Sequence, residues 1–144
     1  DGHTIGHIAY GLMEEKALFS GDSLMVMGCG RLFEGTPEDM WKSLKKLKQL
    51  PKDTMIYSGH EYTKSNIEFA LSVDPQNAKL KARRIRTLDS IAKGIPTVPS
   101  TLEEELETNP FLRESEASIL DNIETVESDP VSRFAKIRAL KDNF

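Results

Sequence analysis

The chain has 144 residues, of which 38% are hydrophobic and 29% charged, as in an ordinary globular protein of one or two small domains. Its net charge of −4 argues against nucleic acid as the main partner, because phosphate binding favours a basic surface. A single cysteine excludes an intrachain disulfide and fits a reducing compartment. No apolar run approaches the length of a membrane helix, which is about 18 residues. We therefore expect a protein of the cytoplasm, or of the mitochondrial matrix, that binds no membrane.

Short apolar runs alternate with turn signals in the first part of the chain, up to Glu61. Three of these runs predict strands, at His7–Leu12, Lys16–Asp22 and Thr54–His60, and the polar pair between the first two is typical of a hairpin. A glycine-rich loop around Cys29 follows the second strand. This part of the chain is therefore predicted to be rich in β-structure.

Helix signals begin after that loop, where Thr36 is a suitable N-cap, Pro37 suits the first helical position and Pro51 ends the helix. From Tyr62 onward every segment is predicted to be helical. Helices are expected at Thr63–Val73, from a cap at Asp74-Pro75 to Ala92, after a capping box formed by Ser100 and Glu103, and from Asp129-Pro130 onward. The chain is thus predicted to divide into a β-rich part, residues 1–61, and a helical part, residues 62–144.

Three residues could form a metal site. His3, Asp22 and His60 each follow a glycine, and the last two also end predicted strands, so their side chains could converge beside the edge of a sheet. Two imidazoles and a carboxylate suit zinc or a similar divalent ion. Their spacings match no local ligand motif, however. From spacing alone, three polar residues that end strands at the surface are the more frequent arrangement.

Other chemically capable residues have structural explanations. His7 begins a strand and is expected to support the structure, and Cys29 has no evident histidine partner and is expected to be a buried thiol. The basic stretch Lys81–Arg86 is expected to form a solvated helix face. Arg138 and Lys141 lie one helical turn apart and could clamp a carboxylate, although spacing alone favours two exposed charges.

The segments GHTIGHIAY, LFSGDSLMVMGCGRLFEGT, YSGHEYT, NPFLR and RALKDNF resemble the second half of glyoxalase II, the hydroxyacylglutathione hydrolase family of the metallo-β-lactamase superfamily. The resemblance covers nearly the whole chain. It implies an α/β fold in which residues 1–61 form the second half of an αββα sandwich and residues 62–144 form an all-helical domain that recognises glutathione. The family's T-H-x-H-x-D-H motif does not occur in this sequence, so the resemblance implies a missing N-terminal half of the domain before Asp1.

The resemblance also implies roles for the candidate residues. His3 and His60 would be metal ligands and Asp22 the carboxylate that bridges two divalent ions, with zinc favoured and iron or manganese as alternatives. Asp22 and His60 would act in catalysis through the bound metal. The residues expected to contact the substrate are Arg31, Phe33, Tyr62, Arg138 and Lys141, of which Phe33 stands where many relatives have tyrosine.

The implied reaction is the hydrolysis of S-lactoylglutathione to lactate and glutathione by a metal-bound hydroxide, in a protein that is monomeric at full length. Two alternatives remain at this point. The protein could be another hydrolase of the superfamily or a persulfide dioxygenase. This chain alone could also be a structural or binding module without catalytic activity, because it would contain only part of the metal ligands.

Overall fold

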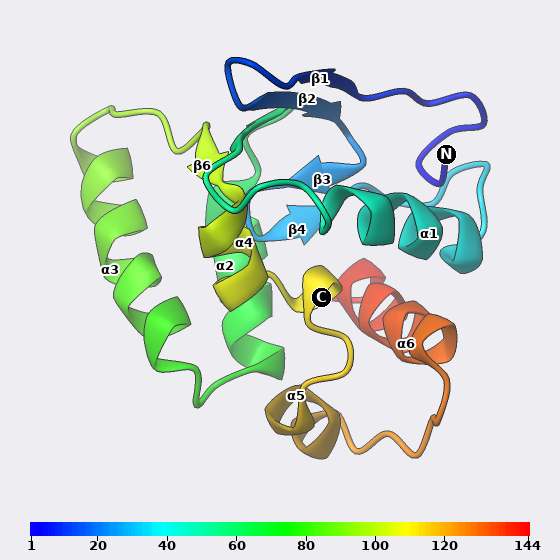
Figure 1. Cartoon of the computed structure of the whole chain (residues 1–144). Coiled ribbons are helices and arrows are strands. Elements are labelled where there is room, and N and C mark those ends of the chain that lie inside the picture. The colour runs from blue at the N-terminus through cyan, green and yellow to red at the C-terminus, as the bar shows by residue number, and fades with distance from the viewer.

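The computed structural model describes all 144 residues, with a small sheet and a hairpin packed against six α-helices (Figure 1). The sheet has four strands in the order β1 (Tyr10–Leu12), β2 (Ala17–Gly21), β5 (Met55–Ser58) and β6 (Ser100–Thr101). β2 and β5 are parallel, whereas the β1–β2 and β5–β6 pairs are antiparallel. The three predicted strands are therefore present, each shorter than the apolar run that predicted it.

A second, two-stranded sheet lies where the sequence predicted only a glycine-rich loop. It is the hairpin of β3 (Leu24–Met25) and β4 (Gly28–Cys29), which is buried throughout. Its turn contains Met27, whose φ of 54° is unusual for a residue with a side chain. Contacts from the helical part hold this turn in place, as described below.

Helix α1 (Pro37–Leu47) forms as its capping signals predict. The Thr36 side chain accepts a hydrogen bond from the Asp39 amide, and the Asp39 carboxylate accepts one from the Thr36 amide. This reciprocal pair satisfies two of the free amides at the start of the helix. Met40 and Leu44 are buried, so the apolar face of the helix covers the core.

The remaining helices follow in the second part of the chain. They are α2 (Thr63–Val73), α3 (Ala78–Ala92), α4 (Leu102–Thr108), the 3₁₀ helix η1 (Pro110–Leu112), α5 (Ala117–Asn122) and α6 (Pro130–Asp142). No helix of the chain is both long and apolar enough to span a membrane. The last helix begins at the predicted cap, since Asp129 accepts hydrogen bonds from the amides of Val131 and Ser132.

Two predicted caps are wrong. Asn77, not Asp74, caps α3, and the buried Asp74 carboxylate instead accepts hydrogen bonds from side chains of the neighbouring segments. Thr101, one residue later than predicted, caps α4. Ser100 belongs to β6 and donates its hydroxyl to the buried Glu105. In both cases tertiary contacts recruit the residue that local sequence would use as a cap.

One hydrophobic core joins the two parts of the chain. Leu18, Ile56 and Met40 from the first part pack with Phe69 and Phe134 from the second, and all five side chains are buried. Helix α6 lies against α1 (Figure 1). The division at residue 61 stays a prediction, and it does not separate two cores.

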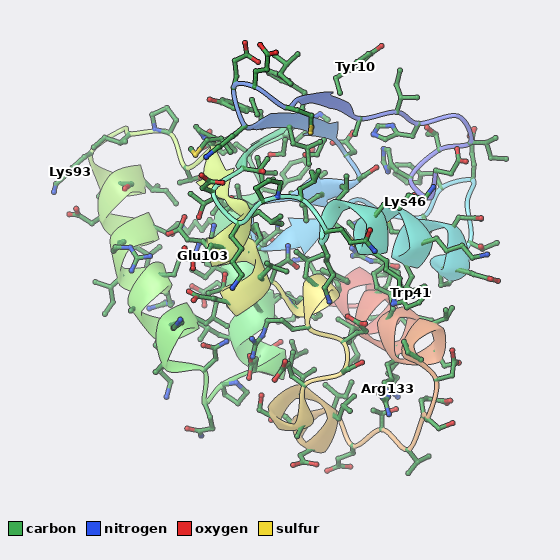
Figure 2. The ribbon with its side chains drawn as sticks, viewed as in Figure 1. Tyr10, Trp41, Lys46, Lys93, Glu103 and Arg133 are labelled. Carbon is green, nitrogen blue, oxygen red and sulfur yellow. The ribbon has the colours of Figure 1, made fainter.

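The far side of the sheet carries exposed apolar side chains. Ile8, Tyr10, Leu12 and Phe19 are 60%, 64%, 48% and 45% exposed. Figure 2 shows Tyr10 extending away from the sheet. Exposed apolar side chains on neighbouring strands are typical of an interface, so they agree with the expectation that further polypeptide covers this face.

Candidate active site

A cavity of about 680 Å³ opens where the sheet edge meets the helical part. It is lined by all eight candidate site residues, His3, Asp22, Arg31, Phe33, His60, Tyr62, Arg138 and Lys141. The three metal candidates are separated by 19 and 38 residues in the sequence. Arg138 and Lys141, two of the substrate candidates, come from α6. The fold therefore brings together residues that sequence spacing alone would leave as separate surface groups, although their roles stay predictions.

Asp22 lies between the two candidate histidine ligands. Its Oδ1 is 2.6 Å from Nδ1 of His60, and its Oδ2 is 3.4 Å from Nε2 of His3. Two ligands bound to one tetrahedral zinc ion are separated by ~3.3 Å, given zinc–nitrogen and zinc–oxygen bonds near 2 Å. The His3–Asp22 pair therefore has the spacing of two ligands of a common ion.

The His60–Asp22 pair is closer than that spacing, because the two side chains form a hydrogen bond. An ion held between them would require them to separate by ~0.7 Å. The side chain of His60 is 53% exposed, and its ring also stacks on that of Tyr62. No three His, Cys, Asp or Glu side chains of the chain already surround a common point at metal-binding distances. The donors thus fit a divalent ion in kind, and they form an incomplete set in number.

The neighbouring His7 contacts the backbone of Asp22, and its assignment as a structural residue that is not a ligand stays a prediction. Its Nε2 accepts a hydrogen bond from the Asp22 backbone amide at 3.1 Å. The ring lies so close to Gly21 that a Cβ there would be 2.6 Å from Nε2, and Gly21 has a φ of 54°. Glycine before Asp22 therefore allows both the turn and the close approach of the ring.

An aromatic side chain packs against each of the two candidate histidine ligands. The ring of Phe33 lies 5.0 Å from that of His3, and the ring of Tyr62 stacks on His60 at 5.3 Å with an angle of 9° between the planes. Both aromatic side chains are more than half exposed and line the cavity. The residues expected to contact the substrate thus lie directly beside the expected metal ligands.

Lys141 also lines the cavity. Its Nζ donates to the backbone carbonyl and the hydroxyl of Ser65 at 3.1 and 3.0 Å, and it lies over the rings of Phe69 and Phe144. Partial burial, together with the nearby positive charges of Arg138 and Arg31, lowers the pKa of Lys141 to about 8. Ser65 was not predicted as a site residue, although its place just after the YSGHEYT segment puts it in the first turn of α2.

Arg138 is not the exposed charge that its spacing predicts. It is 4% exposed, and its Nη1 donates to the carbonyl of Cys29 at 2.9 Å while Nη2 pairs with Asp142 at 2.9 Å. Cys29 is the buried thiol that was expected, and burial raises its pKa to about 11. Arg138 is therefore committed to contacts within the protein, so a clamp formed jointly with Lys141 is not preformed.

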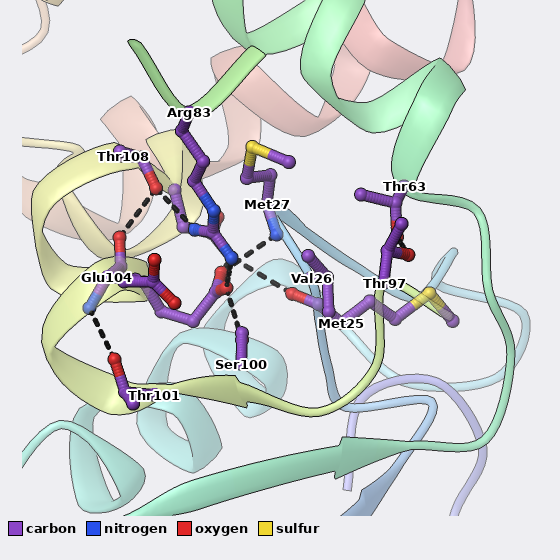
Figure 3. A network of polar contacts seen from close by, with 12 residues as sticks. Met25, Val26, Met27, Thr63, Arg83, Thr97, Ser100, Thr101, Glu104 and Thr108 are labelled. Atoms are coloured by element: carbon purple, nitrogen blue, oxygen red, sulfur yellow. Dashed lines mark hydrogen bonds and ion pairs between the residues drawn. The ribbon is translucent and has the colours of Figure 1, made fainter. Parts of the chain in front are cut away.

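The basic stretch Lys81–Arg86 is also more than a solvated face. Arg84 and Arg86 form exposed ion pairs, but Arg83 is 4% exposed and its Nη2 lies 2.6 Å from a carboxylate oxygen of Glu105, which is fully buried. Arg83 also donates to the hydroxyl of Thr108 (Figure 3). The prediction of a solvated face is therefore wrong for the middle of this stretch, because a buried acid on α4 draws the guanidinium inward.

This buried pair holds the β3–β4 hairpin. Glu105 accepts a hydrogen bond from the amide of Met27 at 2.8 Å, and Asn109 donates to the carbonyls of Met25 and Gly28. These bonds satisfy backbone groups of the turn that are buried away from water. The hairpin leads directly into the cavity wall at Gly30 and Arg31, so the helical part fixes one side of the cavity.

Two family models match this chain, one in each part of the sequence. Residues 61–144 match the family described as hydroxyacylglutathione hydrolase C-terminus, and residues 1–60 match the metallo-beta-lactamase superfamily. The solved structure of ETHE1 from Myxococcus xanthus superposes with a TM-score of 0.50 at 24% identity, covering 94% of this chain and 51% of that one. That likeness concerns the fold. It confirms the expected α/β class, with β6 as a short strand that the sequence pattern did not reveal in the helical part.

Two curated relatives are much more similar in sequence. The hydroxyacylglutathione hydrolase of Ruegeria pomeroyi is 57% identical over 143 residues, and that of Jannaschia sp. is 52% identical over 143 residues. Each comparison covers 99% of this chain and 56% of the relative, so the chain spans little more than half of their length. The chain belongs to the hydroxyacylglutathione hydrolase (glyoxalase II) family of the metallo-β-lactamase superfamily.

Proposed function

We propose that the whole protein hydrolyses S-2-hydroxyacylglutathione thioesters, with S-lactoylglutathione as the reference substrate, to a hydroxy acid and glutathione. The observation that carries this proposal is one cavity lined both by the His3–Asp22–His60 cluster and by the cationic residues Arg31 and Lys141. The names of the similar proteins support the same class of reaction.

His3, Asp22 and His60 would hold divalent metal as part of a larger ligand set. Bound divalent ions would supply an acidified water and a Lewis acid, which thioester hydrolysis near neutral pH requires. Within this chain, His7 holds the backbone of Asp22, and the Arg31 carbonyl holds Nδ1 of His3. The glutathione thiol is acidic compared with an alcohol, so it leaves as thiolate without a strong general acid in the cavity.

The cationic residues of the cavity lining would bind the peptide part of the substrate. Glutathione is an anionic tripeptide thiol, and Lys141 and the exposed Arg31 present positive charge to it, with Arg138 behind them. Tyr62 and Phe33 would pack along the acyl and cysteinyl region beside the ligands. Charge-assisted contacts of this kind favour an anionic thioester over a neutral one.

The test compares substrates in the whole protein. S-lactoylglutathione should be hydrolysed in a metal-dependent manner, and a simple thioester that lacks the glycine carboxylate should have a higher KM. Chelation of the metal should abolish both activities. Turnover of a lactone or a glutathione persulfide in place of the thioester would assign the protein to another reaction of the superfamily.

A further inference from the structure

The buried guanidinium of Arg138 contacts the backbone of the β3–β4 hairpin where it enters the cavity. Its Nη1 donates to the Cys29 carbonyl at 2.9 Å, and Nη2 is anchored by Asp142 on the next turn of α6. The group also lies over the ring of Phe111 at 4.9 Å. These three contacts keep the guanidinium in one place at the end of β4.

The two residues after Cys29 contact two of the three candidate metal ligands, Asp22 and His3. The amide of Gly30 donates to the carbonyl of Asp22 at 2.8 Å, and the carbonyl of Arg31 lies 2.8 Å from Nδ1 of His3. A Cβ at Gly30 would overlap the Asp22 carbonyl oxygen. Three consecutive residues, Cys29–Arg31, therefore connect Arg138 to both Asp22 and His3 through backbone contacts.

The contact to His3 has a chemical consequence. A carbonyl oxygen only accepts hydrogen bonds, so Nδ1 of His3 carries the proton and Nε2 holds the free lone pair. That lone pair faces Oδ2 of Asp22 at 3.4 Å, on the side where a metal ion fits between them. Hydrogen bonds of this kind fix the tautomer and the orientation of ligand imidazoles in metal sites.

We propose that Arg138 is a positioning residue for the metal site, acting through the Cys29–Arg31 segment to hold the imidazole of His3 and the backbone of Asp22. The inference rests on the proposed function only in taking His3 and Asp22 as metal ligands. Loss of a group that orients a ligand typically lowers metal affinity by about 10- to 100-fold.

The experiment uses the whole protein with Arg138→Met, Arg138→Lys and the control Arg133→Met. Arg133 is on the same helix and contacts Glu127 and Ser115, away from the cavity. Zinc affinity is measured by competition with a chelator, and the tautomer of His3 is measured by nitrogen NMR of the metal-free protein. Arg138→Met should lower zinc affinity by about 10- to 100-fold and disturb the His3 signal, Arg138→Lys should have a smaller effect, and Arg133→Met should have none.

Replacement of Lys141 by alanine separates an effect on substrate binding from an effect on the metal site. It should raise KM for S-lactoylglutathione and leave zinc affinity and the His3 signal unchanged. If Arg138→Met does not fold, Arg138→Lys decides, because it keeps a positive charge but cannot make both Nη contacts. Zinc affinity within about twofold of the unmodified protein, with an unchanged His3 signal, would overturn the proposal. Neither measurement uses a thioester, so failure of the proposed reaction would be seen separately, in the substrate comparison.

Discussion

Replacing Arg83 by methionine should destabilise the chain strongly. Its partner Glu105 is fully buried and accepts hydrogen bonds from four donors, at Arg83 Nη2 (2.6 Å), Ser100 Oγ (2.6 Å), Met27 N (2.8 Å) and Asn109 Nδ2 (2.9 Å). Without the guanidinium, three neutral donors face a buried carboxylate that has no counter-charge. Breaking a buried ion pair in this way costs about 3–5 kcal/mol, a large part of the stability of an ordinary domain.

The assay is equilibrium unfolding in urea, followed by circular dichroism and by the fluorescence of Trp41. The control is Arg86→Met on the same helix, because Arg86 pairs with Glu104 at 3.1 Å and their side chains are 62% and 39% exposed. Exposed pairs are worth about 0.2–1 kcal/mol, so the control should lose less than the Arg83 variant by a factor of about three or more. Equal losses for the two variants, or a loss below about 1 kcal/mol for Arg83→Met, would refute the account of the buried pair.

Three further outcomes are expected. In the whole protein, Asp22→Ala should abolish turnover and remove about one metal per chain by elemental analysis, and unchanged activity would contradict the ligand assignment. Lys141 is cationic below its pKa of about 8 and neutral above it, so KM for S-lactoylglutathione should rise as the pH increases through that value, and the Lys141→Gln variant should lack this rise. The isolated 144-residue chain should show little or no thioester hydrolysis and should self-associate in sedimentation experiments through the exposed face around Tyr10, whereas a monomer with full activity would contradict both expectations.

The parts of the fold that sequence predicts well are those whose signal is local. Thr36, Pro37 and the apolar positions of α1 lie within one segment, and their capping and periodicity define the helix without further contacts. The runs Lys16–Asp22 and Thr54–His60 predict strands for the same reason. The site residues were found mainly through motifs, because gaps of 19 and 38 residues carry no geometric information until the strand ends are brought together.

The parts that sequence misses depend on partners far along the chain. The hairpin strands β3 and β4 have two residues each, too few for a periodic pattern, and their turn is held by Asn109 and Glu105 from more than 75 residues away. The sequence pattern predicts exposed side chains for Arg83 and Arg138, because charged residues on helices usually face solvent. Only the fold shows that each guanidinium has buried acceptors.

The small strand β6 has a consequence for how the protein can be divided. Its residues pair with β5, and the next two amides, of Leu102 and Glu103, donate to the carbonyls of Thr54 and Lys52. This segment therefore covers the edge of β5 that would otherwise present unpaired backbone groups. A cut near residue 61 would expose that edge as a template for pairing between molecules, which is a common route to aggregation. The two family matches meet at this boundary, but a fragment that ends there would lack β6, the strand that covers the edge of β5.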